Sequence, residues 1–155
     1  MAVSAVPDAV KQLLALLDTA AGPLLNGVRI MDGPPGPNFS DRERINIGWA
    51  PGTDQAVEIQ QGFASAGARR RDEDFNITCY AEVSWGDTRM DLRRQRLFAI
   101  LDGVDKVLRN SGPAGTTLNG SVQWAHLTVA SLAQVQDPDG AMASAVFTVS
   151  CRARI

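Results

Sequence analysis

The side chains that most often perform chemistry are scarce or poorly spaced in this sequence. The chain contains one histidine, His126, and two cysteines, Cys79 and Cys151, which lack the C-x-x-C spacing of a zinc site. It contains no GxSxG nucleophile elbow, no GxxxxGK[ST] phosphate loop and no HExxH metalloprotease motif. The sequence therefore predicts a protein that is not an enzyme and that has no catalytic residue, metal site or cofactor.

The most unusual local feature is a run of three arginines followed directly by three acids: Arg69, Arg70, Arg71, Asp72, Glu73 and Asp74. Because opposite charges stand so close together, the acids should stay ionised and be unsuited to general acid catalysis. The net charge of the run is zero, and a nucleic-acid-binding patch would not neutralise itself in this way. Two interpretations remain. The run is either a solvated loop that leads into a strand or a subunit contact, at which the arginines of one copy meet the acids of another.

A second group of arginines, Arg89, Arg93 and Arg94, lies near the start of the predicted second helix and off its apolar stripe. Positive charge near a helix N-terminus opposes the helix dipole, and Asp87 and Asp91 offset this only partly. The group is interpreted as either a plain solvated face or a partner contact.

Both cysteines fall on the apolar phase of predicted strands, which indicates buried free thiols. The alternative is a disulfide between two neighbouring strands. His126 shares one side of its strand with Trp124, which is typical of a core or interface histidine.

The bulk composition indicates one globular domain over residues 1–155, with 45% hydrophobic and 21% charged residues. The formal net charge of −2 argues against a dedicated nucleic-acid binder. No stretch approaches the roughly 20 apolar residues of a membrane helix. The first residues carry no positive charge, so we expect neither a signal peptide nor a membrane partner.

Hydrophobic periodicity predicts an α+β fold, with two helices packed on one face of a mainly antiparallel (mixed) β-sheet. The strand at 44–49 and the returning strand at 56–61 should form a hairpin, because Pro51-Gly52-Thr53-Asp54 is a turn signal. The predicted order is α-β-β-β-β-α-β-β. Its members are a helix at 6–17, strands at 28–32, 44–49, 56–61 and 74–85, a helix over about 89–110, and strands at 121–135 and 141–155.

Five segments give the sequence a resemblance to the tail terminator, or tail-completion, proteins of long-tailed bacteriophages. They are Val6–Val10, Met31–Pro34, Gly67–Phe75, Trp85–Asp87 and Cys151–Ile155. The resemblance covers nearly the whole chain in order and length, and none of its motifs is catalytic.

This resemblance implies a virion structural protein that is assembled in the host cytoplasm and located at the tail or neck. The family members form a hexameric ring that caps the tail tube, ends its polymerisation and joins it to the head through a neck or head-completion protein. DNA would pass through the lumen without specific binding, so the lumen should be neutral or acidic. Two alternatives stay open: another neck or head-completion (connector) protein, and a small cytosolic α+β enzyme or ligand-binding domain.

Overall fold

The computed structural model describes residues 2–19, 22–36, 41–67, 69–110 and 113–155 of the chain. Three predictions extend beyond these ranges. Pro37, at the end of the proline-rich loop expected from Gly33, lies outside them. So do residues 111–112, at the expected end of the second helix, and Ala68, within one of the resembling segments.

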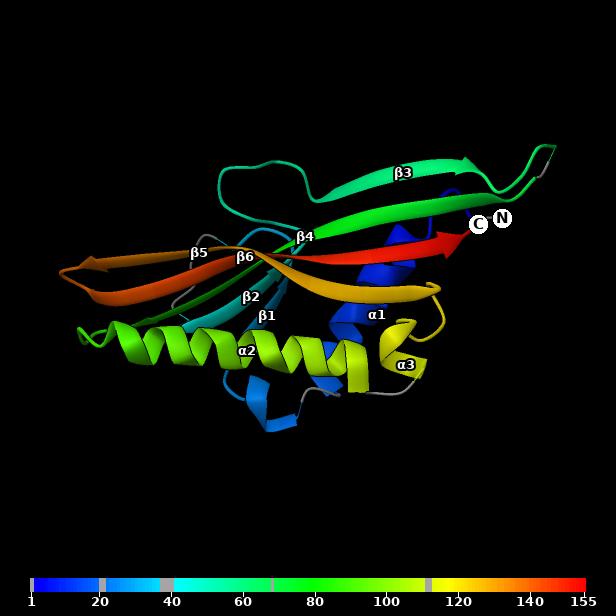
Figure 1. Cartoon of the computed structure of the whole chain (residues 1–155). Coiled ribbons are helices and arrows are strands. Elements are labelled where there is room, and N and C mark those ends of the chain that lie inside the picture. Colours follow the sequence, from blue (N-terminus) through cyan, green and yellow to red (C-terminus); the bar gives the residue numbers. More distant parts are fainter. Residues whose placement is uncertain (1, 20–21, 37–40, 68, 111–112) are drawn as a thin grey trace.

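The described residues form an α+β fold with two long helices and one mixed six-stranded sheet, which confirms the predicted class (Figure 1). The predicted element order is confirmed in part, since two short helices, η1 and α3, interrupt it. The elements are α1 (Val6–Thr19), η1 (Gly22–Leu25), β1 (Arg29–Asp32), β2 (Glu43–Ile47), β3 (Val57–Phe63), β4 (Arg71–Trp85), α2 (Met90–Asn110), α3 (Pro113–Thr116), β5 (Trp124–Asp137) and β6 (Gly140–Arg154).

The sheet is organised around β4 and β6, which are both 15 residues long. The strand order is β1-β2-β4-β6-β5, and β3 pairs with β4 outside this path. Strands β1 and β2 are parallel, whereas all the other pairs are antiparallel. Strands β5 and β3 are therefore free at opposite margins of the sheet.

The predicted hairpin between the second and third strands is wrong. Both β2 and β3 pair with the same edge of β4, one after the other, because β4 is long enough to accommodate both. Thr78 marks the junction, since its carbonyl accepts from the N–H of Gly48 (2.7 Å) and its N–H donates to the carbonyl of Ala56 (3.0 Å). The turn-forming residues 49–55 are therefore a loop that leaves one sheet edge and rejoins it.

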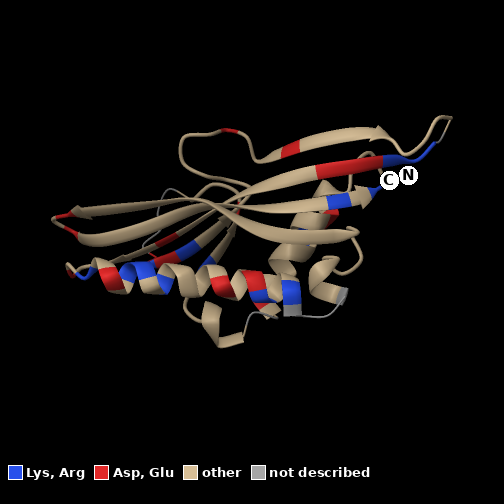
Figure 2. Cartoon of the chain, in the orientation of Figure 1, with Lys and Arg blue, Asp and Glu red and all other residues tan. Residues whose placement is uncertain are grey.

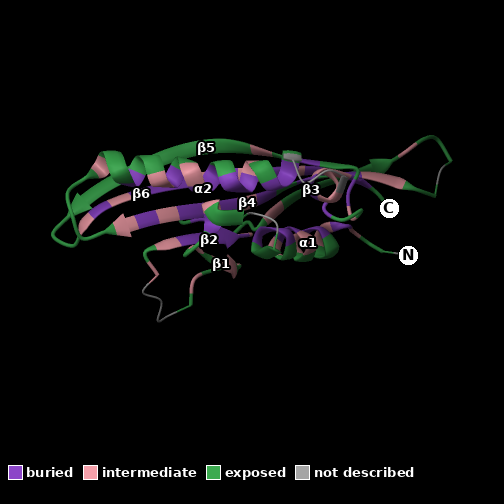
Figure 3. Ribbon diagram, turned by 90° about the horizontal axis from the view of Figure 1, so that it is seen from below, coloured by how far each residue is buried: buried purple, intermediate pink, exposed green. Residues whose placement is uncertain are grey.

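The core lies between the helices and the inner face of the sheet (Figure 3). Alternate residues of β4 and β6, from Phe75 to Val83 and from Ala143 to Ala153, are buried against the apolar stripes of α1 and α2. Cys79 and Cys151 belong to this face as buried free thiols, as predicted. Burial raises the pKa of each thiol to about 12.

The turn between β5 and β6 depends on Gly140. Its φ of +122° lies outside the range that other residues readily adopt, and a Cβ atom there would stand 2.0 Å from the Trp85 carbonyl oxygen. The side chain of Asp137 accepts a hydrogen bond from the N–H of Asp139 (2.8 Å). The Asp-Pro-Asp-Gly sequence thus makes the predicted turn, after which β6 runs back along β5.

Candidate interaction surfaces

The arginine–acid run spans the end of a loop and the beginning of β4. Arg69 and Arg70 are exposed before the strand, whereas the other four residues lie within it. Because side chains alternate along a strand, Arg71 and Glu73 lie on the inner side and Asp72 and Asp74 on the outer side. One sequence motif is therefore divided among three environments. Figure 2 shows the positive charge where the loop joins β4 and the acids next to it along the strand.

The two aspartates are paired within the chain by arginines of β6. Asp72 stands opposite Arg154 in the β4–β6 register and contacts its guanidinium at 2.7 Å, with a second contact to Arg152 at 3.5 Å. Asp74 stands opposite Arg152 and contacts it at 3.6 Å. The hydrogen bond from Arg154 lowers the pKa of Asp72, which keeps this carboxylate ionised. The acids therefore have partners that the local sequence does not show.

The prediction that Glu73 belongs to a solvated loop or a subunit contact is wrong. Its side chain is fully buried, with 0% exposure. One carboxylate oxygen accepts the backbone N–H of Ala5 (2.8 Å), and the other accepts the side-chain amide of Gln61. Ala5 directly precedes α1, and Gln61 is also bonded to the carbonyl of Val3. Glu73 thus ties the start of α1 to β3 and β4, which is a structural task.

Among the described residues, Arg69 and Arg70 make no ion pair or side-chain hydrogen bond, and the side chain of Arg71 donates only to the side chain of Gln61 (3.3 Å). The loop that carries Arg69 and Arg70 projects beyond the sheet (Figure 1). Two of the three predicted arginines are therefore free to contact another molecule.

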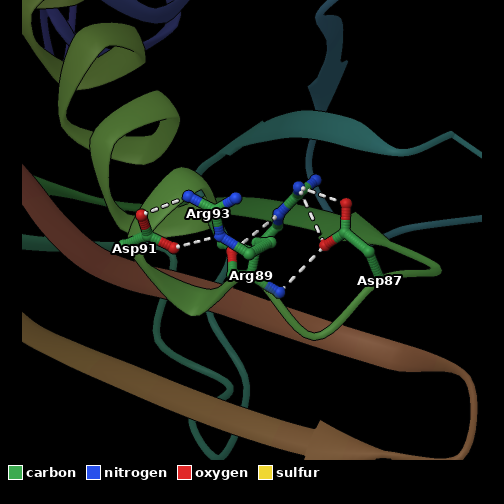
Figure 4. Close-up of polar contacts among 4 residues, drawn as sticks. All are labelled: Asp87, Arg89, Asp91 and Arg93. Carbon is green, nitrogen blue, oxygen red and sulfur yellow. Dashed lines mark hydrogen bonds and ion pairs between the residues drawn. The ribbon is translucent and has the colours of Figure 1, made fainter.

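The arginines at the start of α2 are largely engaged within the chain (Figure 4). Arg93 is buried and donates to both carboxylate oxygens of Asp87 at 3.1 Å. Arg89 contacts Asp91 at 2.9 Å, and its N–H donates to Asp87 at 3.0 Å. These pairs offset the unfavourable placement of positive charge at a helix N-terminus. The interpretation as a solvated face is therefore wrong for Arg93. Its guanidinium also lies over the Trp85 ring, 5.9 Å from the ring centroid.

The third predicted arginine, Arg94, is exposed and donates to Gln134 of β5 (2.7 Å). Arg96, two residues further along α2, contacts Glu43 at 2.6 Å and donates to the carbonyl of Leu24. These contacts hold α2 to the chain on both sides, so of the arginines from 89 to 96 it is Arg89 and Arg94 that present their side chains to solvent.

A polar and aromatic cluster on the outer face of the sheet was not predicted. Glu82 accepts the hydroxyl of Tyr80 (2.8 Å) and a guanidinium N–H of Arg44 (3.3 Å). Trp49 packs edge-on against Tyr80, with ring centroids 5.6 Å apart. The cluster fastens the loop after β2 to the sheet. The signal that could have revealed it is the position of Arg44, Tyr80 and Glu82 on the polar faces of two strands, β2 and β4.

The edge strand β5 carries an uncovered apolar surface that sequence reasoning also missed. Val129 and Leu132 are exposed on its helix-bearing side, next to exposed Phe98 of α2. A shallow groove runs between the two elements and is lined by Phe98, Leu101, Asp102, Asp105, Arg109, Leu127 and Val129. Exposed apolar patches of this kind mark contacts with other proteins. The available signal was a stretch from Trp124 to Gln136 without any Lys, Arg, Asp or Glu.

The other candidate residues do not form a catalytic or metal site in the described parts of the chain. His126 is exposed and stacks on Trp124 at 4.9 Å between ring centroids, so it is not a core histidine. Within the described ranges, no group of three or more His, Cys, Asp or Glu side chains could hold a metal ion. None of the described helices has the length and apolar character needed to cross a membrane. Neither a protein-family model nor a curated protein matches this sequence.

Proposed function

We propose that the chain is a phage tail terminator protein, a structural component of the virion. Six copies would form a ring that caps the tail tube, ends its polymerisation and joins it to the head through a neck protein. The resemblance of the five sequence segments supports this family. The observation that carries the proposal is the uncovered apolar edge formed by β5 and α2, because such a surface is built for protein contact.

Termination by such a ring is geometric. A subunit that joins its neighbours through two different surfaces makes a head-to-tail contact, and this contact closes into a ring when the rotation permits. One face of the ring matches the tube, and the other face presents a different surface, so no further tube subunit can add. The unequal sheet margins, β5 on one side and β3 on the other, are compatible with such a contact.

The charge distribution of the chain supports a ring lumen through which DNA can pass without being bound. The outer-face acids Asp72 and Asp74 are paired with arginines of β6, and the formal net charge of the chain is −2. A strongly basic lumen would hold phosphates through counterion release. We infer that the free arginines Arg69 and Arg70 contact a neighbouring subunit or the tail tube and do not hold DNA.

Negative-stain imaging of the purified chain, alone and with tail tubes, tests the proposal. We expect rings, and tubes of uniform length with a ring at one end. Binding to portal-bearing heads in place of tails would favour another neck or head-completion protein. A protein that stays monomeric alone and with tubes would refute the ring.

Charge reversal tests the role of the free arginines. Arg69→Glu combined with Arg70→Glu should weaken ring assembly or tail capping while circular dichroism shows an unchanged fold, because neither side chain has an ion-pair partner among the described residues. Lys11→Glu, an exposed charge reversal on α1, is the matched control and should leave assembly unchanged. If the double variant caps tails as well as the control does, these arginines are only part of a solvated loop.

A further inference from the structure

Two edge strands at opposite margins of the sheet lack the usual protection against pairing. Strand β5 has no Lys, Arg, Asp, Glu or Pro from Trp124 to Gln136, and its single irregularity is a bulge between Val129 and Ser131. Strand β3 carries one charge, Glu58. Natural edge strands are normally guarded by charges, prolines or a covering element. A 14-residue edge strand whose only charge is its last residue, Asp137, therefore indicates a partner strand.

The directions of the two edges fit each other. Strand β5 runs antiparallel to β6, and β6 runs antiparallel to β4, so β5 and β4 point the same way. Strand β3 runs antiparallel to β4. When two copies lie side by side in the same orientation, β5 of one and β3 of the next are therefore antiparallel and can hydrogen-bond as a continuous sheet.

Both edges leave large apolar side chains exposed on the same face. On β5 these are Val129 (43% exposed) and Leu132 (40%), which stand opposite the inward-facing Phe147 and Ala145. On β3 they are Ile59 (45%) and Phe63 (76%), and Ile59 stands opposite the inward-facing Phe75. A junction of the two edges would cover all four, together with Phe98 of α2.

The surroundings of β3 limit how β5 of another copy can approach. Strand β1 lies outside β2, and the loop at residues 49–55 leaves the sheet directly before β3. An incoming β5 must therefore pair through its second half, while its first half extends past Phe63. This shift brings Arg69 and Arg70 alongside the groove of the copy that supplies β5, whose rim carries Asp102, paired with Lys106 at 4.0 Å, and Asp105, paired with Arg109 at 2.6 Å.

We propose that β5 of one copy pairs with β3 of a second copy, forming one antiparallel sheet across every subunit junction. In this register Ile59 of that second copy packs against the second half of β5 near Leu132, and Phe63 packs at the near end of the groove between β5 and α2. The proposal rests on the ring assembly proposed above, and it names the surfaces that build the ring.

Lysine substitution at the two edges tests this junction in the full chain. Leu132→Lys on β5 and Ile59→Lys on β3 should each raise the concentration at which rings dissociate at least tenfold, as measured by native mass spectrometry. Leu92→Lys is the matched control, because Leu92 is also an exposed leucine (39%) but lies on α2, outside both edge strands and the groove. It should retain rings. Circular dichroism checks that each variant is folded.

Cross-linking identifies which strands meet. Leu132→Cys and Ile59→Cys, combined in one chain and treated with a short bismaleimide, should give a ladder of covalent multimers, whereas each single variant should stay monomeric on a denaturing gel. The native thiols of Cys79 and Cys151 are buried and should not react. Dimers from Leu132→Cys alone would show β5–β5 pairing and overturn the proposal.

The experiments distinguish a failure of the proposed edge junction from a failure of the proposed ring. If the wild-type chain forms rings and both lysine variants also do, only the edge junction is wrong. If the wild-type chain is monomeric with and without tail tubes, the ring itself is wrong and the junction with it.

Discussion

The buried carboxylate of Glu73 should be a major contributor to stability. Glu73→Ala removes the acceptor for the N–H of Ala5 and for the amide of Gln61. The Ala5 N–H is buried, so leaving it without a partner costs about 1–3 kcal/mol. Gln61 is exposed and can bond to water, so its loss is about 0.5–1.5 kcal/mol. Together we expect the free energy of unfolding to fall by about 1.5–4.5 kcal/mol.

Urea denaturation followed by circular dichroism measures this loss, at one fixed protein concentration because assembly shifts apparent stability. The midpoint should fall while the m-value stays constant. The matched control is Asp74→Ala, the neighbouring acid on the opposite strand face. Asp74 has a half-exposed side chain and one 3.6 Å contact, so its removal should cost about 0–1 kcal/mol. Equal losses for the two variants would refute the structural role assigned to Glu73.

Three further outcomes follow from the fold. A thiol reagent at pH 8 should label Cys79 and Cys151 only slowly in the native protein and rapidly in urea, because both thiols are buried with a pKa of about 12; rapid native labelling would contradict this. Gly140→Ala should destabilise by more than about 2 kcal/mol in urea denaturation, because it combines a positive φ with a backbone clash, whereas Gly86→Ala meets only an ordinary 3.9 Å contact and should cost far less. The Arg154 guanidinium lowers the pKa of Asp72, so this stabilisation is present above the ordinary carboxyl pKa of 3.8 and is lost as pH falls through the lowered value. The Tm difference between the wild type and Asp72→Asn should therefore hold from neutral pH to about pH 5 and shrink as the pH falls further.

Hydrophobic periodicity predicted the helices and strands, because the pattern of apolar residues within one continuous segment marks its buried face. The alternation from Phe75 to Val83 and the regular final strand each mark one buried side, and the structure places both strands at the centre of the sheet. The same alternation predicted that Cys79 and Cys151 are buried. Local turn chemistry was equally informative at the β5–β6 turn, where Asp137 to Gly140 reverses the chain.

Pairing between strands could not be predicted in the same way. The turn-forming residues 51–54 suggested a hairpin, but the length of β4 allows β2 and β3 to occupy its edge in series. A turn sequence indicates only that the chain changes direction. It does not indicate which strand the following residues pair with. The edge position of β5 was hidden for the same reason, since it depends on the order of all six strands.

The sequence by itself determined an α+β domain with buried thiols, and it drew attention to the charged run at residues 69–74. Only the tertiary structure decided what each charge does. It buries Glu73 under α1, pairs Asp72 and Asp74 with arginines more than seventy residues away, and leaves Arg69 and Arg70 free. Charges that are adjacent in sequence alternate in direction along a strand, and their partners come from neighbouring strands. The local pattern therefore revealed the presence of the charges, whereas strand pairing assigned their partners.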